Sequence, residues 1–210
     1  TVTNDATGCD ANAMLTITID PTPVVSPATD TFCDEDQVDT ALSGYDDQVG
    51  PGAGYTVTWF SDSARLVPAT STGGALPVGD TIFYATVTND ATGCDANAML
   101  TITINANPTC IATAPTPQCF GVAQQLNVTP TPAETGTGTS ADPYIYTYLW
   151  EDVGTSTGTG YLDSTSIPNP LMTGAPIGTY DFKVTVTNIA TGCSTTCTVS
   201  AVVWNCTPDC

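Results

Sequence analysis

The sequence predicts an all-β protein built from tandem β-sandwiches. Three observations support this fold class: apolar and polar residues alternate in several runs, no segment keeps a helical period beyond one turn, and a long stretch of sequence is repeated. The alternation indicates the strands, and the repeat sets the length of each domain. We therefore expect sandwiches joined into a rod by short linkers that contain proline.

The repeat is almost exact. Residues 1–20 return at 86–105 with one change, Asp20 against Asn105, and a diverged third copy begins at Thr185. The copies are spaced by about the length of one small β-domain. This spacing predicts the C-terminal hairpin of an incomplete repeat at 1–20, full repeats at 21–105 and 106–205, and the start of a following repeat at 206–210. We expect the chain to be a window on a longer array.

Each repeat is expected to end in a hairpin. In the second copy, apolar residues alternate with polar ones over 83–88 and 98–104, as in half-buried strands. Gly93 lies between the two runs and can adopt the left-handed conformation that closes a type I turn with a bulge. Upstream strands are expected at 55–60 and 144–150, each with a tryptophan that would fill the core of its sandwich.

The charge of the chain excludes several function classes. There are 21 acidic residues against two basic ones, Lys183 and Arg65, and the net charge is −19. Such a surface repels nucleic acid and anionic membranes, and no apolar run is long enough for direct membrane insertion. The absence of histidine leaves no base for a Ser-His or Cys-His nucleophile, and no pattern positions a carboxylate pair. We expect no enzyme activity.

The nine cysteines, without any histidine, favour disulfides in an oxidising compartment. Zinc is the minor alternative, because Cys193-x3-Cys197 and Cys206-x3-Cys210 are loosely spaced pairs. We expect Cys33–Cys94 to close the first full repeat. In the next repeat, four cysteines allow three pairings: Cys110, Cys119, Cys193 and Cys197. The pairing of Cys119 with Cys193 and of Cys110 with Cys197 best matches the Cys33–Cys94 pair expected for the first full repeat. No partner is assigned to Cys9, Cys206 and Cys210.

The first full repeat carries the motifs Cys33, Val57-Thr58-Trp59-Phe60, Gly79, Tyr84-Ala85-Thr86-Val87-Thr88-Asn89 and Thr92-Gly93-Cys94. In these motifs it resembles the immunoglobulin-like repeats of large secreted proteins of Bacteroidota. The next repeat carries Pro108-Thr109-Cys110, Cys119, Trp150, Gly178-Thr179-Tyr180, Val184-Thr185-Val186-Thr187-Asn188 and Gly192-Cys193-x3-Cys197. In these motifs it is similar to PKD-like domains, although Glu151-Asp152-Val153-Gly154 departs from the usual W-x-F-G-D-G. The resemblance implies an extracellular cell-surface adhesin or spacer, often exported by type IX secretion.

Two kinds of surface site are expected. Carboxylates gather after Cys33, where oxygen-rich loops could hold calcium, and the candidates are Asp34, Glu35, Asp36 and Asp39. Their spacing matches no EF-hand, and a solvated acidic face is the favoured explanation. Short Asp-Ser or Asp-Thr motifs are similar to O-glycan acceptors of exported Bacteroidota proteins, at Thr40, Ser63, Thr81 and Ser164.

The sequence therefore predicts a structural repeat segment of a secreted fibre or giant adhesin, acting as a stiff disulfide-braced stalk. Its expected partners are further repeats of the same polypeptide or neighbouring fibre subunits. The alternatives are a glycan- or protein-binding module, with or without calcium, and an accessory spacer of a secreted enzyme.

Overall fold

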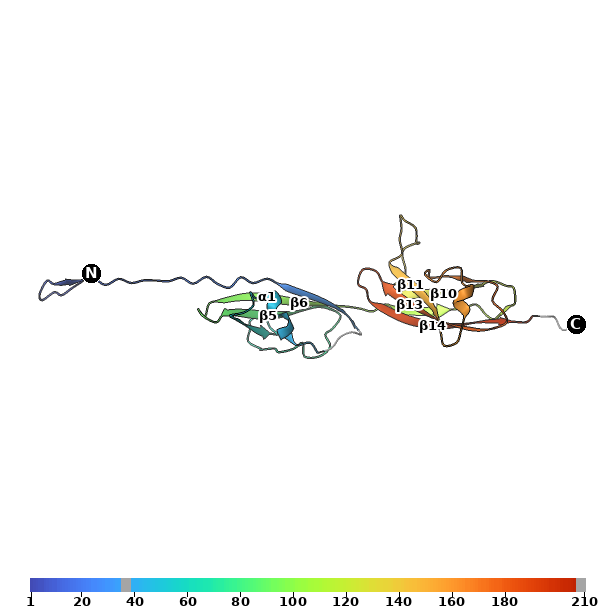
Figure 1. Cartoon of the computed structure of the whole chain (residues 1–210), viewed down its shortest axis with the longest axis horizontal. Helices are drawn as coiled ribbons and strands as arrows, with labels where there is room; N and C mark the ends of the chain where they lie inside the picture. Colours follow the sequence, from blue (N-terminus) through green and yellow to red (C-terminus); the bar gives the residue numbers. More distant parts are fainter. Residues whose placement is uncertain (35–38, 207–210) are drawn as a thin grey trace. The chain divides into compact units, whose positions relative to one another are not determined.

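The structure of the chain is a computed structural model that describes residues 1–34 and 39–206. The chain divides into two compact units, one of Thr1–Asp30, Asp39–Gly74 and Ile82–Thr101, the other of Thr31–Val38, Ala75–Thr81 and Ile102–Cys210. Figure 1 shows that strands form nearly all the regular structure, and no described helix exceeds four residues. The all-β prediction is confirmed, whereas the repeat boundaries stay a prediction.

The first sheet has the strand order β3-β6-β5-β4. Its long central hairpin is β5 (Gly79–Asn89) and β6 (Asp95–Asn105), flanked by β3 (Ala28–Cys33) and β4 (Tyr55–Phe60). The expected alternation is confirmed, because the inward side chains are at most 6% exposed: Phe83, Ala85, Val87, Ala98, Leu100, Ile102 and Ile104. The period of two thus fixes which face of this hairpin is buried.

A helical turn helps to cover this sheet. The 3-10 helix η2 (Leu42–Tyr45) and the helix α1 (Asp46–Val49) bury Leu42 and Val49 completely. Trp59 of β4 is also buried, as predicted, and its indole Nε1–H donates to Asp46 Oδ1 at 2.7 Å. This bond satisfies the polar end of the indole, which is the usual requirement for a buried tryptophan.

The second sheet repeats this arrangement, with the order β11-β13-β14-β8. Its hairpin is β13 (Gly178–Asn188) and β14 (Ser194–Trp204), flanked by β11 (Tyr146–Asp152) and, in parallel with β14, by β8 (Gln118–Cys119). The order reproduces that of β4, β5, β6 and β3 in the first sheet. The two repeats therefore share one strand order in addition to their sequence motifs.

Short strand pairs and a core complete the second unit. The pairs are β7 (Thr109–Thr113) with β10 (Asn127–Thr131), and β9 (Gln124–Gln125) with β12 (Leu171–Met172). Trp150 is buried and meets the ring of Phe182 edge-on at 6.2 Å between centroids. The 3-10 helix η3 (Gly158–Tyr161) packs against the same phenylalanine, since the space beside Gly158 is filled by its ring.

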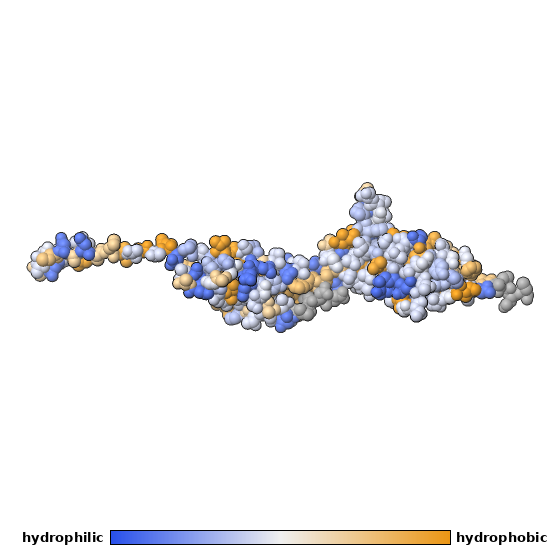
Figure 2. All heavy atoms as spheres, in the orientation of Figure 1, coloured by the Kyte–Doolittle hydropathy of each residue, from blue (hydrophilic) through white to orange (hydrophobic). Residues whose placement is uncertain are grey.

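The same sequence folds differently at the N-terminus. Residues 1–20 form only β1 (Val2–Thr3) and β2 (Asp10–Ala11), and residues 12–27 have no helix or strand. Leu15 is 81% exposed and Ile17 75%, whereas their counterparts in β6 are buried. Figure 2 shows hydrophobic atoms along this segment. The expected full hairpin is therefore wrong for 1–20, because no packed sheet face receives its apolar side chains.

Candidate functional site

The most distinctive local structure is a turn that ends in cysteine and is built three times. In the copy between β5 and β6, Asn89 Oδ1 accepts from the backbone N–H of Ala91 at 3.0 Å and of Thr92 at 3.2 Å. Gly93 has a φ of 72° and its N–H donates to Asn89 O at 2.8 Å. The predicted left-handed glycine is confirmed, and Asn89 holds the turn with its own side chain.

The other two copies have nearly the same geometry. Asn4 Oδ1 and Asn188 Oδ1 each accept two backbone N–H groups at 2.9 and 3.2 Å. Gly8 and Gly192 have φ values of 64° and 75°. The turn therefore forms from local interactions alone, because it persists at Asn4, where the rest of the hairpin does not form.

The turn presents a cysteine beside the residue that precedes the repeat. Cys94 Sγ lies 3.8 Å from Asp20 O, and Cys193 Sγ lies 3.9 Å from Asn105 O. Asp20 and Asn105 occupy the same position of the repeated sequence. The two sulfurs thus lie beside equivalent carbonyl groups, but Cys193 is buried and in a disulfide, whereas Cys94 is half-exposed and a thiol.

Two of the predicted disulfides are wrong and one is confirmed. Cys33 bonds to Cys193, with Cα atoms 5.5 Å apart, so the expected Cys33–Cys94 pair does not form. Cys119 bonds to Cys206 rather than to Cys193, with Cα atoms 5.2 Å apart. The expected Cys110–Cys197 bond is present, and both residues pack against the core of the second unit.

The strand register explains why the hairpin cysteine cannot pair within its own sheet. Cys119 lies opposite Trp204, at the end of the eleven-residue strand β14, whereas Cys193 precedes the start of that strand. An eleven-residue strand is about 35 Å long, and a disulfide needs Cα atoms within ~7 Å. In the first sheet, Cys33 is bonded to Cys193, whose sulfur lies 3.9 Å from Asn105 O at the end of the eleven-residue strand β6, whereas Cys94 precedes the start of β6.

The missed partner of Cys119 had a signal in the sequence. Cys110 and Cys197 are 87 residues apart, and so are Cys119 and Cys206. This equal spacing indicates two parallel links between the same pair of segments. A repeat boundary before residue 206 places Cys206 in a different repeat from Cys119 and therefore hides this spacing. Residues 207–210, which include Cys210, lie outside the described residues.

The acidic candidates do not gather into a described metal site. Asp39 Oδ1 accepts the backbone N–H of Gly73 at 3.0 Å and of Gly74 at 3.2 Å, and a hydrogen bond from Ser71 lowers the pKa of its carboxyl. Asp34 is exposed, and Glu35 and Asp36 lie outside the described residues. Within 1–34 and 39–206, no group of three metal-ligating side chains comes together. Calcium binding stays a prediction.

The predicted glycan acceptors lie in different environments. Ser63 is exposed in the loop that follows β4, and Thr40 and Ser164 are half-buried in other loops. Thr81 lies within β5 and is half-buried. A transferase needs an accessible hydroxyl, so Ser63 is the most accessible of the four; glycosylation stays a prediction.

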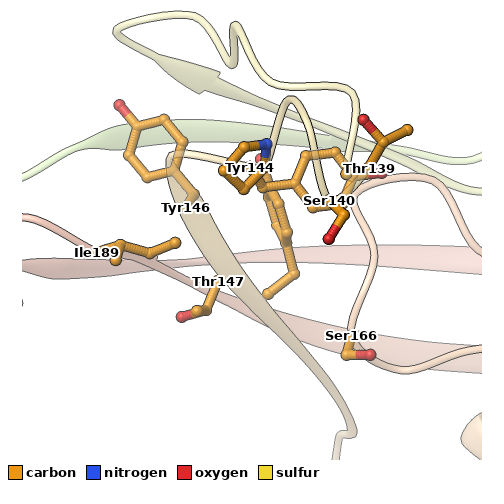
Figure 3. A pocket seen from close by; sticks show the side chains of 10 residues that line it. Thr139, Ser140, Tyr144, Tyr146, Thr147, Ser166 and Ile189 are labelled. Atoms are coloured by element: carbon orange, nitrogen blue, oxygen red, sulfur yellow. The ribbon is translucent and has the colours of Figure 1, made fainter.

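A hollow of about 420 Å³ lies at one end of the second unit. Figure 3 shows Tyr146 and Thr147 from β11 beside Thr139 and Ser140 from the preceding loop, with Ile189 from the cysteine-bearing turn. Tyr144, which also lines it, meets Tyr148 edge-on at 5.8 Å between ring centroids. Tyr146 and Tyr148 are buried, so Tyr144 offers the accessible ring on which a sugar or peptide could stack, beside the hydroxyls of Thr139 and Ser140.

Glu134 holds the loop beside this hollow, and no sequence motif marks this residue as important. Its carboxylate accepts the N–H groups of Gly136 and Ile145 at 2.9 Å and the hydroxyl of Tyr148 at 2.8 Å. Burial raises the pKa of this carboxyl, but the hydrogen bonds outweigh burial and the pKa lies below its usual value. A carboxylate used in this way is a structural acceptor and not a poised acid or base.

Comparisons with known proteins show the fold. No family model matches the chain, and no curated protein matches it. The DSCAM structure of the N-terminal eight Ig domains matches 86% of this chain and 27% of its own, at 11% identity and a TM-score of 0.50. Drosophila OTK extracellular domains 3–5 match over 88% and 62%, at 13% identity and a TM-score of 0.42. The DSCAM match confirms the immunoglobulin-like fold. The chain spans less than two thirds of either structure.

In the part of the chain that the structure describes, no helix has the length and apolar character to cross a membrane.

Proposed function

We propose that this chain is a structural repeat segment of a secreted cell-surface fibre or giant adhesin, of the Bacteroidota type, with the last full repeat PKD-like. It acts as a disulfide-braced stalk. The observation that supports this most is the cysteine-bearing turn, which is built alike in three copies and in the last copy is bonded to Cys33. A module repeated with its linking cysteine serves connection, whereas catalysis needs a single constellation of groups.

The disulfides suit a chain that carries tension. A pull on the two ends passes from residue 33 to residue 193 through the Cys33–Cys193 bond, which bypasses the segment between them. Because the force passes through the disulfide, the bypassed segment, which spans 160 residues of sequence, carries no load. Covalent bypassing preserves length under force and limits unfolding, as a stalk in an oxidising extracellular space requires.

Single-molecule pulling on the whole chain tests this function. Without reductant we expect no extension step from the segment between residues 33 and 193. In Cys33→Ser the force passes instead through Cys110–Cys197, and the segment from 33 to 110 (110 − 33 = 77 residues) can extend. Its contour length is roughly 270 Å at ~3.5 Å per residue. Cys94→Ser is the matched control and should behave as the unmodified chain.

An unmodified chain that extends by this length without reductant would contradict the stalk function. So would a Cys33→Ser variant that extends no further than Cys94→Ser.

The hollow beside Tyr144 supports a second candidate, a glycan- or protein-binding module. The ring of Tyr144 and the hydroxyls beside it offer stacking and hydrogen bonds together. Calcium held near Asp34 and Asp39 is part of this second proposal. A glycan array with the whole chain, with and without calcium, tests it, and Tyr144→Ala should remove any signal that arises from the hollow.

A further inference from the structure

We propose that Cys94 is the covalent attachment point for another copy of this repeat placed before it, whose strand-end cysteine, equivalent to Cys33, forms a disulfide with it. The junction would have the same chemistry as Cys33–Cys193. This inference rests on the proposed function as a repeat segment and names the partner that each repeat binds.

The first support is the identity of the two presenting turns. The N–H of Cys94 donates to Thr92 Oγ1 at 3.3 Å, and the N–H of Cys193 donates to Thr191 Oγ1 at the same distance. Each cysteine carbonyl accepts from the asparagine that begins its turn, at 2.9 Å for Asn89 and 2.8 Å for Asn188. Both cysteines are therefore held in one backbone geometry.

The second, independent support is that the equivalent residue already makes the bond. Cys193 is joined to Cys33, the last residue of β3, with Cα atoms 5.5 Å apart. Its sulfur lies beside Asn105 O, as that of Cys94 lies beside Asp20 O. The internal repeat thus acts as a comparison structure in which the same position is occupied.

Among the described residues, no cysteine of the chain itself is a fitting disulfide partner for Cys94. Cys33, Cys110 and Cys119 are each bonded elsewhere. Cys9 is a thiol, but it lies in a further copy of the same turn and corresponds to Cys94 rather than to Cys33. Cys94 precedes the first residue of β6, whereas Cys33 is bonded to Cys193, whose sulfur lies 3.9 Å from Asn105 O at the last residue of β6. The fitting partner is a cysteine that ends the first strand of a preceding repeat.

The bond forms by ordinary thiol–disulfide exchange. The thiolate of one cysteine attacks a small-molecule disulfide, such as oxidised glutathione, and releases one thiol. The thiolate of the second cysteine then attacks the mixed disulfide and releases the other thiol. The two cysteine thiols lose two electrons and two protons, and the oxidant is reduced to two thiols. Cys94 is half-exposed and can take part in this exchange.

The experiment inserts one extra repeat into the whole chain. Residues 1–105 are followed directly by residues 21–210, a junction that the near-identity of 1–20 and 86–105 leaves natural. The protein is refolded with oxidised and reduced glutathione and its disulfides are mapped by mass spectrometry of unreduced peptides. We expect Cys33 of the first copy to be bonded to Cys94 of the second copy, and Cys33 of the second copy to Cys193.

Two variants assign the bond to a copy. Cys94→Ser in the second copy should leave one Cys33 as a thiol, so that a maleimide labels one more site. Cys94→Ser in the first copy is the matched control and should leave every bond unchanged. Cys33 and Cys94 of one copy bonded to each other would overturn the proposal. So would free thiols at both Cys33 of the first copy and Cys94 of the second in a chain that still forms Cys110–Cys197.

Either of these outcomes would leave the stalk function standing, because the pulling experiment measures the Cys33–Cys193 bond of the unextended chain. If the pulling experiment fails but the new disulfide forms in the extended chain, the mechanical role is refuted and the covalent junction between repeats still stands.

Discussion

Cys33 and Cys193 are bonded to each other across 160 residues of sequence, which joins the end of strand β3 to the turn before β14. We expect peptide mapping of the oxidised chain to recover this pair, and Cys33→Ser to expose a thiol at Cys193 that reacts with iodoacetamide. Cys94→Ser should leave the pair intact. A Cys33–Cys94 peptide in the unmodified chain would contradict the structure.

The Cys110–Cys197 disulfide should stabilise the folded chain mainly by restricting the unfolded state. It links β7 to β14 over 87 residues, and such a link restricts the unfolded chain. The double variant Cys110→Ser with Cys197→Ser is expected to lower the free energy of unfolding by about 2–4 kcal/mol. Urea unfolding followed by tryptophan fluorescence measures this, with Cys94→Ser as the control that should stay within about 0.5 kcal/mol.

Gly158 is expected to tolerate no side chain. A Cβ at this position would meet the ring of Phe182, with Cε1 only 2.7 Å away, and Phe182 is fully buried. Gly158→Ala should therefore lower the free energy of unfolding by about 1–3 kcal/mol through overpacking.

Gly160→Ala is the matched control for this variant. It lies in the same 3-10 helix η3 and has open space around its Cα. Its stability should be unchanged or rise by about 0.4–1 kcal/mol, because alanine restricts the unfolded chain. Equal melting temperatures for the two variants would contradict the predicted contact with Phe182.

Glu134 should make part of the stability depend on pH. Its carboxyl pKa is lower in the folded chain than in the unfolded one, so its contribution is present above the unfolded pKa and is lost as the pH falls through the folded pKa. Glu134→Gln is expected to lower the free energy of unfolding by about 1 kcal/mol at pH 7. The difference between the two proteins should shrink below about pH 4.

Thermal melts at pH 7 and pH 3 measure this effect. Glu151→Gln is the control, because Glu151 forms an exposed ion pair with Lys183 at 2.9 Å. Exposed pairs contribute about 0–1 kcal/mol, so this variant should change little at pH 7. A Glu134→Gln difference that is the same at both pH values would show that the charge is not involved.

Local rules sufficed to predict much of the fold. The alternation around Val87 and Leu100 identified the buried face of the hairpin, and Gly93 identified its turn, because strand period and left-handed glycine are properties of short segments. Trp59 and Trp150 were correctly placed in the cores for the same reason. The pairing of cysteines was only partly predictable, since it depends on which strand ends meet in space. Glu134 carried no sequence pattern at all.

The repeated segment separates the two kinds of information most clearly. Its sequence alone determines the turn, because Asn4, Asn89 and Asn188 form the same short hydrogen bonds wherever they occur. Tertiary structure alone decides the strands, since Leu100 is buried in β6 and Leu15, in the same sequence, is exposed. A turn is stabilised within a few residues, whereas a long hairpin needs a packed face to bury its apolar side chains. Which sulfur meets Cys33 is decided in the same way, by the positions of strand ends that lie far apart in sequence.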